Sequence, residues 1–414
     1  MTCVPARGAH PGQGRIRRPG FFLRRFGRWI ALGLYGFPFA AGRDSSPVGR
    51  FRALARRTRF ARRGKLVRAF TSVTMTLTWP FGALSMALQT RAQMREYGQG
   101  PSSLHVLVDM YWLALRHNIP PWEYGLFRFS TAERRKHMQD YVYSNDLVGF
   151  AGLNARRGAD NRDVQDKARF AKICASNGFP HVAILAVFDR GKQIHPETPF
   201  VPDAPILWVK SLRLSGGAGG AKWIKDDEAY RNVKGRSTPA TELGDEFREH
   251  DCLVQPFIEN HPDIAHVTNG ALASLRIVTG LDARGQAEFV TALIALPHGV
   301  RESSVAGIFC SIEYESGRIR RAAFPEGEEI ANHPDTGAPI IGVTVPYWHE
   351  SINLVLRAHA VAFSGFAFLG WDIALTKEEP LLLEANSGWG AIFHQMLDGP
   401  LGHTSFSRIV SQYV

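Results

Sequence analysis

The stretch that decides the fold is residues 365–390, GFAFLGWDIALTKEEPLLLEANSGWG. It predicts a β-hairpin, because two apolar segments, WDIAL and PLLLEAN, flank a polar turn of sequence TKEE. If Leu375 pairs with Leu381 across that turn, Asp372 lies directly opposite Glu384. The sequence therefore predicts two carboxylates that face each other across one pair of strands.

The facing carboxylates of Asp372 and Glu384 would repel each other at the separation of a strand pair, about 5 Å. Two ordinary polar residues on a solvated face are the alternative explanation, but the flanking residues are apolar and a buried unpaired carboxylate is costly. A cation between the acids removes the repulsion. Asn386 shares the face of Glu384, because side chains alternate along a strand. Carboxylate and amide oxygens are hard ligands, so Asp372, Glu384 and Asn386 form a predicted Mg²⁺ site.

The spacing Asp-x₁₁-Glu-x-Asn resembles the magnesium hairpin of the ATP-grasp superfamily. It is most similar to the sugar-transfer-associated, or α-L-glutamate-ligase-related, branch, and the resemblance covers roughly residues 130–405. It implies an α+β fold, the ATP-grasp fold, in which two α+β lobes hold ATP between them, with ATP and two Mg²⁺ ions as cofactors. It also implies an ATP-grasp domain at 166–405, with a lid at about 204–260 and a metal-binding lobe at about 261–405.

Charge is distributed unevenly along the 414 residues, whose net charge is +11. Residues 1–68 contain 17 Lys and Arg residues and one acid, Asp44. Since the whole chain has 49 basic and 38 acidic residues, the remainder has 32 and 37, a net charge of −5. The folded body is therefore mildly acidic, which argues against a specific nucleic-acid partner.

The cysteines indicate a reducing compartment. They form no CxxC pair, which argues against a zinc site or a disulfide framework and suits a cytoplasmic protein. The four cysteines are Cys3, Cys174, Cys252 and Cys310.

Residues 1–100 are expected to form a basic Arg/Gly/Pro-rich tail with apolar segments, largely non-globular, because this composition buries little apolar surface. The apolar run at 29–41 is too short to span a bilayer. The uncharged run at 70–88 is either a membrane span or, as we favour, an interfacial segment beside a polybasic stretch. The tail is thus expected to be disordered or to lie on an anionic membrane surface, at the periphery of the inner membrane. A further alternative is that translation starts later and residues 1–74 are not made.

A helical entry region is expected at 101–165, since residues 104–116 have the periodicity of an amphipathic helix. The next helix is expected to have Asp163 as its N-cap and to stop at Gly178. In ATP-grasp proteins a lysine of this short helix reaches the nucleotide phosphates, and Lys167 matches its position. Without the resemblance, Lys167 would be an ordinary solvent-facing helix residue.

A strand, a lysine and a glycine-rich loop follow one another in APILWVKSLRLSGGAGGAKWIK, residues 204–225. Glycines let backbone N–H groups turn toward an anion, and the lysine adds a point charge. Such a loop alone is equally typical of a flexible hairpin tip, but its distance ahead of the acidic hairpin is similar to that of the ATP-grasp lid. The resemblance implies phosphate contacts from Lys210, Ser215, Gly216, Gly217 and Gly219.

The strand CLVQPFI, residues 252–258, matches the hinge whose backbone meets the adenine edge in ATP-grasp proteins. The resemblance assigns Gln255, Phe257 and Ile258 to this contact. Related proteins often carry a glutamate here for the ribose hydroxyls, whereas this chain has Pro256, with Glu259 slightly later.

Arg276 lies inside the apolar strand SLRIVT, and an arginine in such a strand needs an anionic partner. One interpretation is a buried ion pair with a core carboxylate. The other rests on the resemblance to an LRVVT-like strand of ATP-grasp proteins, which supplies an arginine near the transferring phosphate and makes Arg276 the catalytic candidate. Antiparallel hairpins are expected at 273–296 and 307–324.

The predicted function is an ATP- and Mg²⁺-dependent ligase that activates a carboxylate as an acyl phosphate for attack by an amine, in polysaccharide or amino-acid conjugate synthesis. One alternative is an ATP-grasp kinase that phosphorylates a sugar or another hydroxyl. A kinase needs a general base at the acceptor, and only Asp335 and His394 stand out. The other alternative is a non-catalytic, nucleotide-binding, membrane-associated protein. The small-molecule or saccharide acceptor is not specified by any residue.

Overall fold

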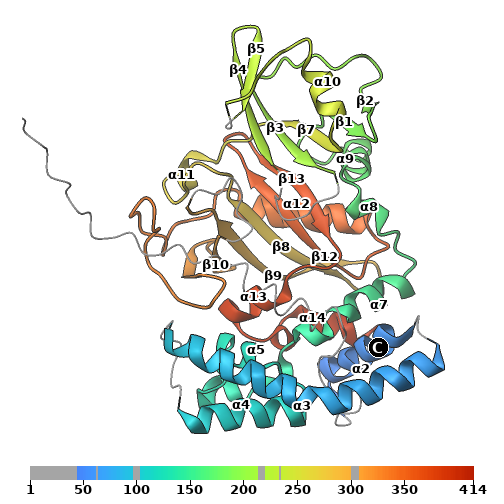
Figure 1. Cartoon of the computed structure of the whole chain (residues 1–414), viewed down its shortest axis with the longest axis vertical. Helices are drawn as coiled ribbons and strands as arrows, with labels where there is room; N and C mark the ends of the chain where they lie inside the picture. The colour runs from blue at the N-terminus through green and yellow to red at the C-terminus, as the bar shows by residue number, and fades with distance from the viewer. Residues whose placement is uncertain (1–43, 62–63, 97–102, 213–219, 233–234, 300–306) are drawn as a thin grey trace, which may run out of the picture.

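The computed structural model describes residues 44–61, 64–96, 103–212, 220–232, 235–299 and 307–414. Within these residues a six-stranded sheet occupies the middle of the molecule, a seven-stranded sheet forms a lobe at one end, and a layer of helices lies at the other end (Figure 1). The fold is α+β with two α+β lobes, as predicted.

Most elements follow one another closely, but the long segment 324–347 separates the last strand of the second hairpin from the helix that follows it. The described helices are α2 (Pro47–Ala61), α3 (Lys65–Glu96), α4 (Leu104–His117), α5 (Pro121–Leu126), α6 (Ala132–Arg135), η1 (Met138–Asp140), η2 (Ser144–Asp146), α7 (Val148–Arg156), α8 (Arg162–Gln165), α9 (Lys167–Ser176), α10 (Leu243–Arg248), α11 (Pro262–Ala265), α12 (Trp348–Ala362), α13 (Ala391–Asp398), η4 (Leu401–His403) and α14 (Ser405–Ser411). The described strands are β1 (Ala186–Asp189), β2 (Lys192–His195), β3 (Ile206–Ser211), β4 (Ala221–Asp226), β5 (Ala229–Asn232), β6 (Ser237–Pro239), β7 (Cys252–Pro256), β8 (Ser274–Leu281), β9 (Ala287–Leu296), β10 (Ile308–Ile312), β11 (Ile319–Ala323), β12 (Phe368–Leu375) and β13 (Pro380–Asn386).

The six-stranded sheet has the order β11-β10-β9-β8-β12-β13, and every neighbouring pair is antiparallel. The two hairpins predicted for this part of the chain, β8–β9 and β10–β11, are confirmed. Gly317 in the second turn has a φ of 69°, a backbone conformation that favours glycine. The helix α12 covers one face of the sheet and leads the chain into β12.

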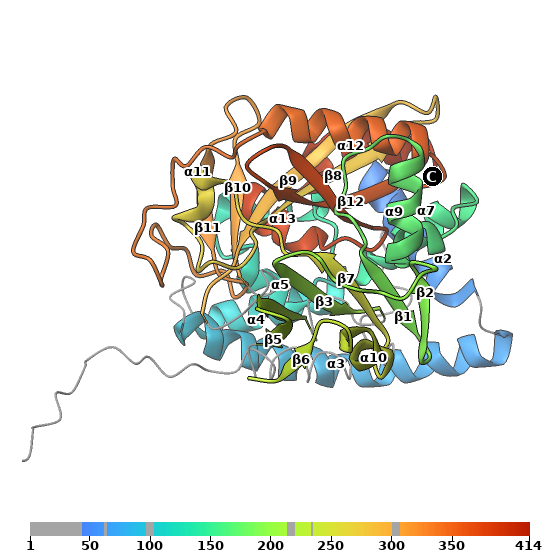
Figure 2. The ribbon, with the colours of Figure 1, turned by 90° about the horizontal axis from the view of Figure 1, so that it is seen from above.

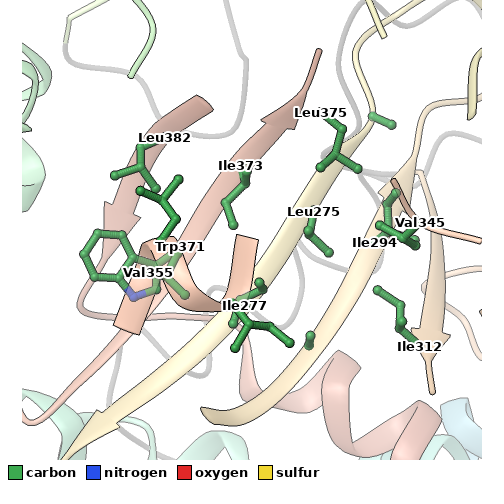
Figure 3. Close-up of a cluster of buried hydrophobic side chains, with 14 of the residues drawn as sticks. Leu275, Ile277, Ile294, Ile312, Val345, Val355, Trp371, Ile373, Leu375 and Leu382 are labelled. Carbon is green, nitrogen blue, oxygen red and sulfur yellow. The ribbon is translucent and has the colours of Figure 1, made fainter. Parts of the chain in front are cut away.

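The main hydrophobic core lies between the six-stranded sheet and α12. Ile277 of β8 and Trp371 of β12 point to the same face and pack in one cluster with Val355 of α12 (Figure 3). All three side chains are fully buried. Since side chains alternate along a strand, the preceding Arg276 and the following Asp372 point to the opposite face of the sheet.

Helices from both ends of the chain pack on that opposite face. Phe309 of β10 stacks on Phe393 of α13, with ring centroids 4.3 Å apart. Phe51 of α2 lies 4.9 Å from Phe150 of α7 and 5.3 Å from Phe406 of α14, again between ring centroids. The helix α2 is therefore part of the folded body.

The seven-stranded sheet has the order β2-β1-β7-β3-β4-β5-β6, also antiparallel throughout. One of its faces packs on α10, where the Phe247 ring lies 5.5 Å from the Trp223 ring of β4. Val209 of β3 is buried in the same cluster. Its neighbours Trp208 and Lys210 therefore point to the face away from α10.

The segment after α9 connects the two sheets. The N–H of Leu382 in β13 donates to the carbonyl of Pro180 at 3.0 Å, and the N–H of Val182 donates back to Leu382 at 3.1 Å. Shortly after, the N–H of Leu185 donates to Val254 of β7 at 2.9 Å. One extended segment thus fixes β7 and β3 beside the acidic hairpin, an arrangement seen from above in Figure 2.

The expectation of a largely non-globular tail at residues 1–100 is wrong for the part that the structure describes. Phe51 of α2 and Trp79 of α3 are fully buried, and Trp79 Nε1 donates to the carbonyl of Ala114 in α4 at 3.1 Å. Composition conceals this packing because these side chains are buried against distant parts of the chain rather than against each other. Residues 1–43, including the apolar run at 29–41, lie outside the described residues.

The helical entry region begins where the periodicity predicts it. Ser103 is the N-cap of α4, and its side chain accepts a hydrogen bond from the N–H of Val106. Among the described helices, none is both long enough and apolar enough to cross a membrane.

Glu123 of α5 is expected to make the free energy of unfolding depend on pH. Its side chain is fully buried, and burial raises the pKa of the carboxyl group from 4.5 to about 8. Oε1 accepts the N–H of Ser144 at 2.8 Å, whereas Oε2 has no hydrogen-bond partner within the described part of the chain. Between these two pKa values the native state binds more protons than the unfolded state, so the free energy of unfolding falls as pH rises from about 4.5 to about 8.

We expect Glu123→Gln, which mimics the protonated acid, to remove that decline. The variant should match the parent protein near pH 4.5 and be the more stable of the two near pH 8, as measured by urea unfolding at both pH values. Glu133→Gln, at an exposed position of α6, is the control and should keep the parent slope. Identical pH dependence in the parent and Glu123→Gln would contradict the assignment.

Candidate active site

The acidic hairpin consists of β12 and β13, as predicted, but its register near the turn differs. Leu375 pairs with Pro380, so the predicted pairing of Leu375 with Leu381 is wrong. One extra residue in β13 then forms a β-bulge. Because of the bulge, Asp372 lies opposite Glu384, which is the predicted pairing.

Arg276 of β8 completes a row of three charged residues across neighbouring strands. It pairs with Asp372 on the side away from Glu384. Arg276 Nε donates to Asp372 Oδ1 at 2.6 Å and Nη2 donates to Oδ2 at 2.7 Å, a bidentate ion pair. The Asp372 side chain is 7% exposed and that of Arg276 is 31% exposed. The ion-pair interpretation of Arg276 is therefore correct, and its partner is one of the predicted metal ligands.

Asn386 connects the two acids of the row. Its Nδ2 donates to Asp372 Oδ2 at 3.1 Å and to Glu384 Oε1 at 3.4 Å. Burial raises the pKa of Glu384, and the nearby Asp372 raises it further, while Lys210 and Lys167 lower it. The structure thus brings the three predicted metal ligands together, with Asp372 buried and Glu384 and Asn386 half-buried.

Lys210, on β3 of the seven-stranded sheet, is influenced by the acids of the hairpin. Burial lowers the pKa of its ammonium group to about 8, against the raising effect of Glu384. Lys167 lowers this pKa as well, and Asp372 raises it. Lys210 of one lobe and the two acids of the other therefore lie near enough to shift one another's pKa across the junction of the two sheets.

Lys167 is the first residue of α9 and is half-buried. The predicted N-cap, Asp163, is wrong, because it lies inside the short preceding helix α8 and pairs with Arg169. Asp166 is the N-cap of α9, and its side chain accepts N–H groups of the first turn. Gly178, with a φ of 67°, follows the helix as predicted.

The residues predicted to meet the adenine lie at and after the end of β7. Gln255 is buried, and Phe257 and Ile258 are half-buried. The N–H of Phe257 donates to the carbonyl of Ile206 at 3.1 Å, so hydrogen bonding to β3 continues beyond the strand. Lys222 Nζ lies 4.1 Å from the centroid of the Phe257 ring, a cation–π contact.

The sequence did not identify Trp208 and Lys222 as candidates, although both lie near the residues predicted to meet the adenine. They are partners on β3 and β4, and Trp208 shares a face with Lys210. The alternation of ILWVK contains that signal. A Cβ at Gly220 would lie 2.4 Å from the Trp208 ring, so the loop needs a glycine where it passes this side chain. The glycine-rich loop residues predicted to contact phosphate lie outside the described residues: Ser215, Gly216, Gly217 and Gly219.

The two candidate bases of the kinase alternative have other roles in the fold. Burial, with a contribution from Arg276, lowers the pKa of His394 to about 3, so its imidazole is neutral and a poor proton acceptor near pH 7. Asp335 is exposed and accepts the N–H of Gly299 at 2.6 Å. Both residues therefore have structural explanations.

Residues 151–405 match the sequence model of a family described as sugar-transfer associated ATP-grasp. The chain belongs to this family. The matched range includes both sheets, Arg276, Lys167, Lys210 and the acidic hairpin. The comparison with curated proteins gives no match.

Solved ATP-grasp-type structures are only distantly similar. The L-amino acid ligase from Bacillus licheniformis is 10% identical, with 58% of this chain and 46% of that chain covered and a TM-score of 0.32. The D-alanine-D-alanine ligase from Helicobacter pylori is 12% identical, with 61% and 58% covered and a TM-score of 0.33. The biotin carboxylase from Campylobacter jejuni is 11% identical, with 61% and 47% covered and a TM-score of 0.36. The chain spans about half the length of these proteins, and no functional argument rests on them.

The ion pair of Arg276 with Asp372 predicts a measurable stability effect. Arg276→Met leaves a buried carboxylate without its cation, and we expect the free energy of unfolding to fall by about 2 kcal/mol without nucleotide or metal. Arg276→Met combined with Asp372→Asn should recover most of this loss, because the carboxylate that lost its cation is also removed.

Chemical unfolding at pH 7 measures both variants. Arg318→Met, at an exposed position beside the β10–β11 turn, is the matched control and should change the free energy of unfolding by less than about 0.5 kcal/mol. A loss that persists undiminished in the double variant would show that Arg276 stabilises the fold by packing rather than through Asp372.

Proposed function

We propose that this ATP-grasp protein is an ATP- and Mg²⁺-dependent ligase that activates a substrate carboxylate for attack by an amine. The observation that carries the proposal is the row of Arg276, Asp372 and Glu384 opposite Lys210, at the junction of two lobes. The row supplies oxygen ligands, and the lysine supplies a cation for phosphate. Phosphoryl transfer depends mainly on such positioning and charge stabilisation.

The residues of the acidic hairpin fit Mg²⁺ by their chemistry. The raised pKa of Glu384 reflects two carboxylates close together with little water, a cost that a divalent cation offsets. In our proposal Asp372, Glu384 and Asn386 hold two ions, with the Asn386 amide turned so that its oxygen faces the metal. Bound Mg²⁺ would neutralise phosphate charge and align the nucleotide.

The nucleotide side of the proposal combines residues of both lobes. Lys210 and Lys167 meet the phosphates together with the glycine-rich loop, Ser215, Gly216, Gly217 and Gly219. Gln255, Phe257 and Ile258 meet the adenine. Burial lowers the pKa of Lys210 to about 8, so a phosphate anion compensates for the cost of keeping this lysine charged.

Arg276 favours carboxylate activation over hydroxyl phosphorylation. Two of its three guanidinium nitrogens donate to Asp372, and we assign the third, Nη1, to an oxygen of an anionic substrate. The γ-phosphoryl group passes from ATP to the substrate carboxylate, which gives ADP and an acyl phosphate, and an amine then displaces phosphate to form a C–N bond. The surroundings of His394 and Asp335 offer no support for a base at an acceptor hydroxyl.

The class of acceptor is proposed from the family description alone. Since the family is described as sugar-transfer associated, saccharide-linked carboxylates and amines are the first compounds to screen, with amino acids second. Three cysteines of the described residues are free and buried, which suits the cytoplasmic location that we propose.

Glu384→Gln tests the metal site. The substitution keeps the shape of the side chain but removes one of two anionic ligands, so we expect Mg²⁺-dependent ATP affinity to fall by about tenfold or more. Calorimetric titration with Mg·ATP measures this, and a thermal unfolding curve checks that the fold survives. Glu379→Gln, in the exposed turn of the same hairpin, is the control. Unchanged Mg·ATP affinity in Glu384→Gln would refute the site.

Lys210→Met tests the phosphate contact. ATP affinity should fall by roughly tenfold to a hundredfold, whereas adenosine affinity should change little, because only the phosphates lose a partner. Lys225→Met, exposed on β4, should bind ATP like the parent protein. Equal weakening of ATP and adenosine by Lys210→Met would indicate a purely structural role.

Hydroxylamine trapping tests the reaction class. With an accepted carboxylate and Mg·ATP, the enzyme should form a hydroxamate together with ADP, because hydroxylamine attacks an acyl phosphate. A stable phosphate ester that does not react with hydroxylamine would replace the ligase proposal by the kinase alternative. Nucleotide binding without ADP release, across the whole screen, would favour a non-catalytic role.

A further inference from the structure

The outer side of α3 carries a row of large apolar side chains that face solvent. The row is Leu66, Val67, Phe70, Val73, Leu77, Phe81, Leu84 and Leu88, which are between 41% and 87% exposed. Spacings of three and four residues place nearly all of them on one face of the helix. The opposite face is buried against the body through residues such as Met75 and Trp79. The helix thus has two apolar faces, and only one of them is used within the described fold.

A second apolar row lies on the neighbouring helix α4. Leu104, Val108 and Trp112 recur every four residues and are 65%, 58% and 59% exposed. Single exposed apolar residues are common on soluble proteins, but rows of this length on adjacent helices mark an interaction surface. Both helices belong to the layer at the end of the molecule opposite the seven-stranded lobe (Figure 1).

Charges bracket the apolar row of α3. Residues 69–90 contain no Asp, Glu, Lys or Arg. Lys65 and Arg68 precede this stretch, and Arg91 and Arg95 follow it, whereas Glu96 is the one acid of the helix. Upstream, residues 1–43 contain eight arginines and no acid. The apolar row therefore has basic residues at both of its ends.

The hydroxyl groups beside the row are already satisfied. Thr74 Oγ1 donates to the carbonyl of Phe70 at 2.9 Å, and Thr78 Oγ1 donates to that of Thr74 at 2.8 Å. Thr76 Oγ1 makes the same kind of bond to Ser72, at 2.8 Å. These three hydroxyls need no water as a partner, so contact with an apolar medium leaves their donors satisfied.

We propose that the outer face of α3 docks on an anionic lipid surface, with the helix lying parallel to the membrane and its apolar row inserted among the acyl chains. An apolar face with basic residues at its borders is what such a surface binds. A second copy of the chain is the less favourable occupant. Parallel or antiparallel pairing along α3 would place basic ends against basic ends, with Glu96 as the one acidic residue of each helix to offset them.

The proposed surface lies away from the candidate active site. The helix α3 belongs to the layer at one end of the molecule, and the lobe that carries Lys210 lies at the other end (Figure 1). This inference stands independently of the proposed ligase activity, because none of its residues belongs to the site.

Vesicle flotation of the full chain tests the proposal. Vesicles of phosphatidylglycerol and phosphatidylcholine should carry the protein, and pure phosphatidylcholine vesicles should carry at least about tenfold less. The test variant replaces Phe70, Leu77 and Phe81 by glutamate and should lose more than about tenfold in binding to the anionic vesicles.

The matched control variant replaces Ile194, Val201 and Val361 by glutamate. These residues are 59–65% exposed and lie outside α3 and α4, so the control has the same change in charge at exposed apolar positions elsewhere on the surface. It should bind anionic vesicles within about twofold of the parent protein. Thermal unfolding checks that both variants fold.

Three outcomes would overturn the proposal. The first is equal binding of the parent protein to neutral and anionic vesicles, or binding to neither. The second is equal loss of binding in the α3 variant and its control, which would reflect net charge alone. The third is a concentration-dependent dimer, measured by light scattering without lipid, that the α3 variant abolishes while vesicle binding is retained.

Discussion

Arg276 and Asp372 face each other on adjacent strands, and their bidentate pairing allows a second carboxylate, Glu384, to stand on the next strand. Without the arginine, the buried Asp372 carboxylate would lie beside the half-buried Glu384 carboxylate with no cation from β8. Lys210 and Lys167 add two positive charges from outside the sheet. Counted as formal charges, three cations and two anions give these five side chains a net charge of +1, a balance that in our proposal serves a metal ion and a polyphosphate together.

Close backbone approach is the second constraint on the site. A Cβ at Gly370 of β12 would lie 2.5 Å from the Cβ of Trp389, so the chain after β13 can fold back over β12 only across a glycine. Gly370 is also the partner of Asn386, which makes this fold-back part of the same hairpin. In the other lobe, Gly220 likewise lies so close to a tryptophan, Trp208, that a Cβ would not fit between them. In each sheet a tryptophan covers a glycine beside the charged residues.

The sequence predicted the parts of the fold that depend on local patterns. The hairpins, α4 and the facing pair of Asp372 and Glu384 follow from alternation and periodicity. The β-bulge next to Asp372 could not be predicted, because one inserted residue leaves no compositional signal. The predicted partner of Leu375 was therefore wrong, while the predicted pairing of Asp372 with Glu384 was correct.

Predictions that depend on long-range packing were less successful. In the sequence, the segment of α3 resembles an apolar stretch with nothing to pack against. Its burial depends on contacts such as that between Trp79 and Ala114, 35 residues apart. Asp163 and Asp166 are equally good N-cap residues by type, and the choice between them depends on where α8 ends. The sequence proposed the site's residues, but the proximity of Lys210 to Glu384 is a property of the tertiary structure.

An aromatic contact chain links the N-terminal helices to the acidic hairpin. Phe51 of α2 lies 4.9 Å from Phe150, and Phe150 lies 4.8 Å from Trp389, between ring centroids. Trp389 in turn packs on Gly370, two residues before Asp372. The family match starts at residue 151, so both Phe51 and Phe150 lie outside it. Phe51 of α2 and Phe150 in the first turn of α7 therefore support the hairpin from beyond the start of the matched segment.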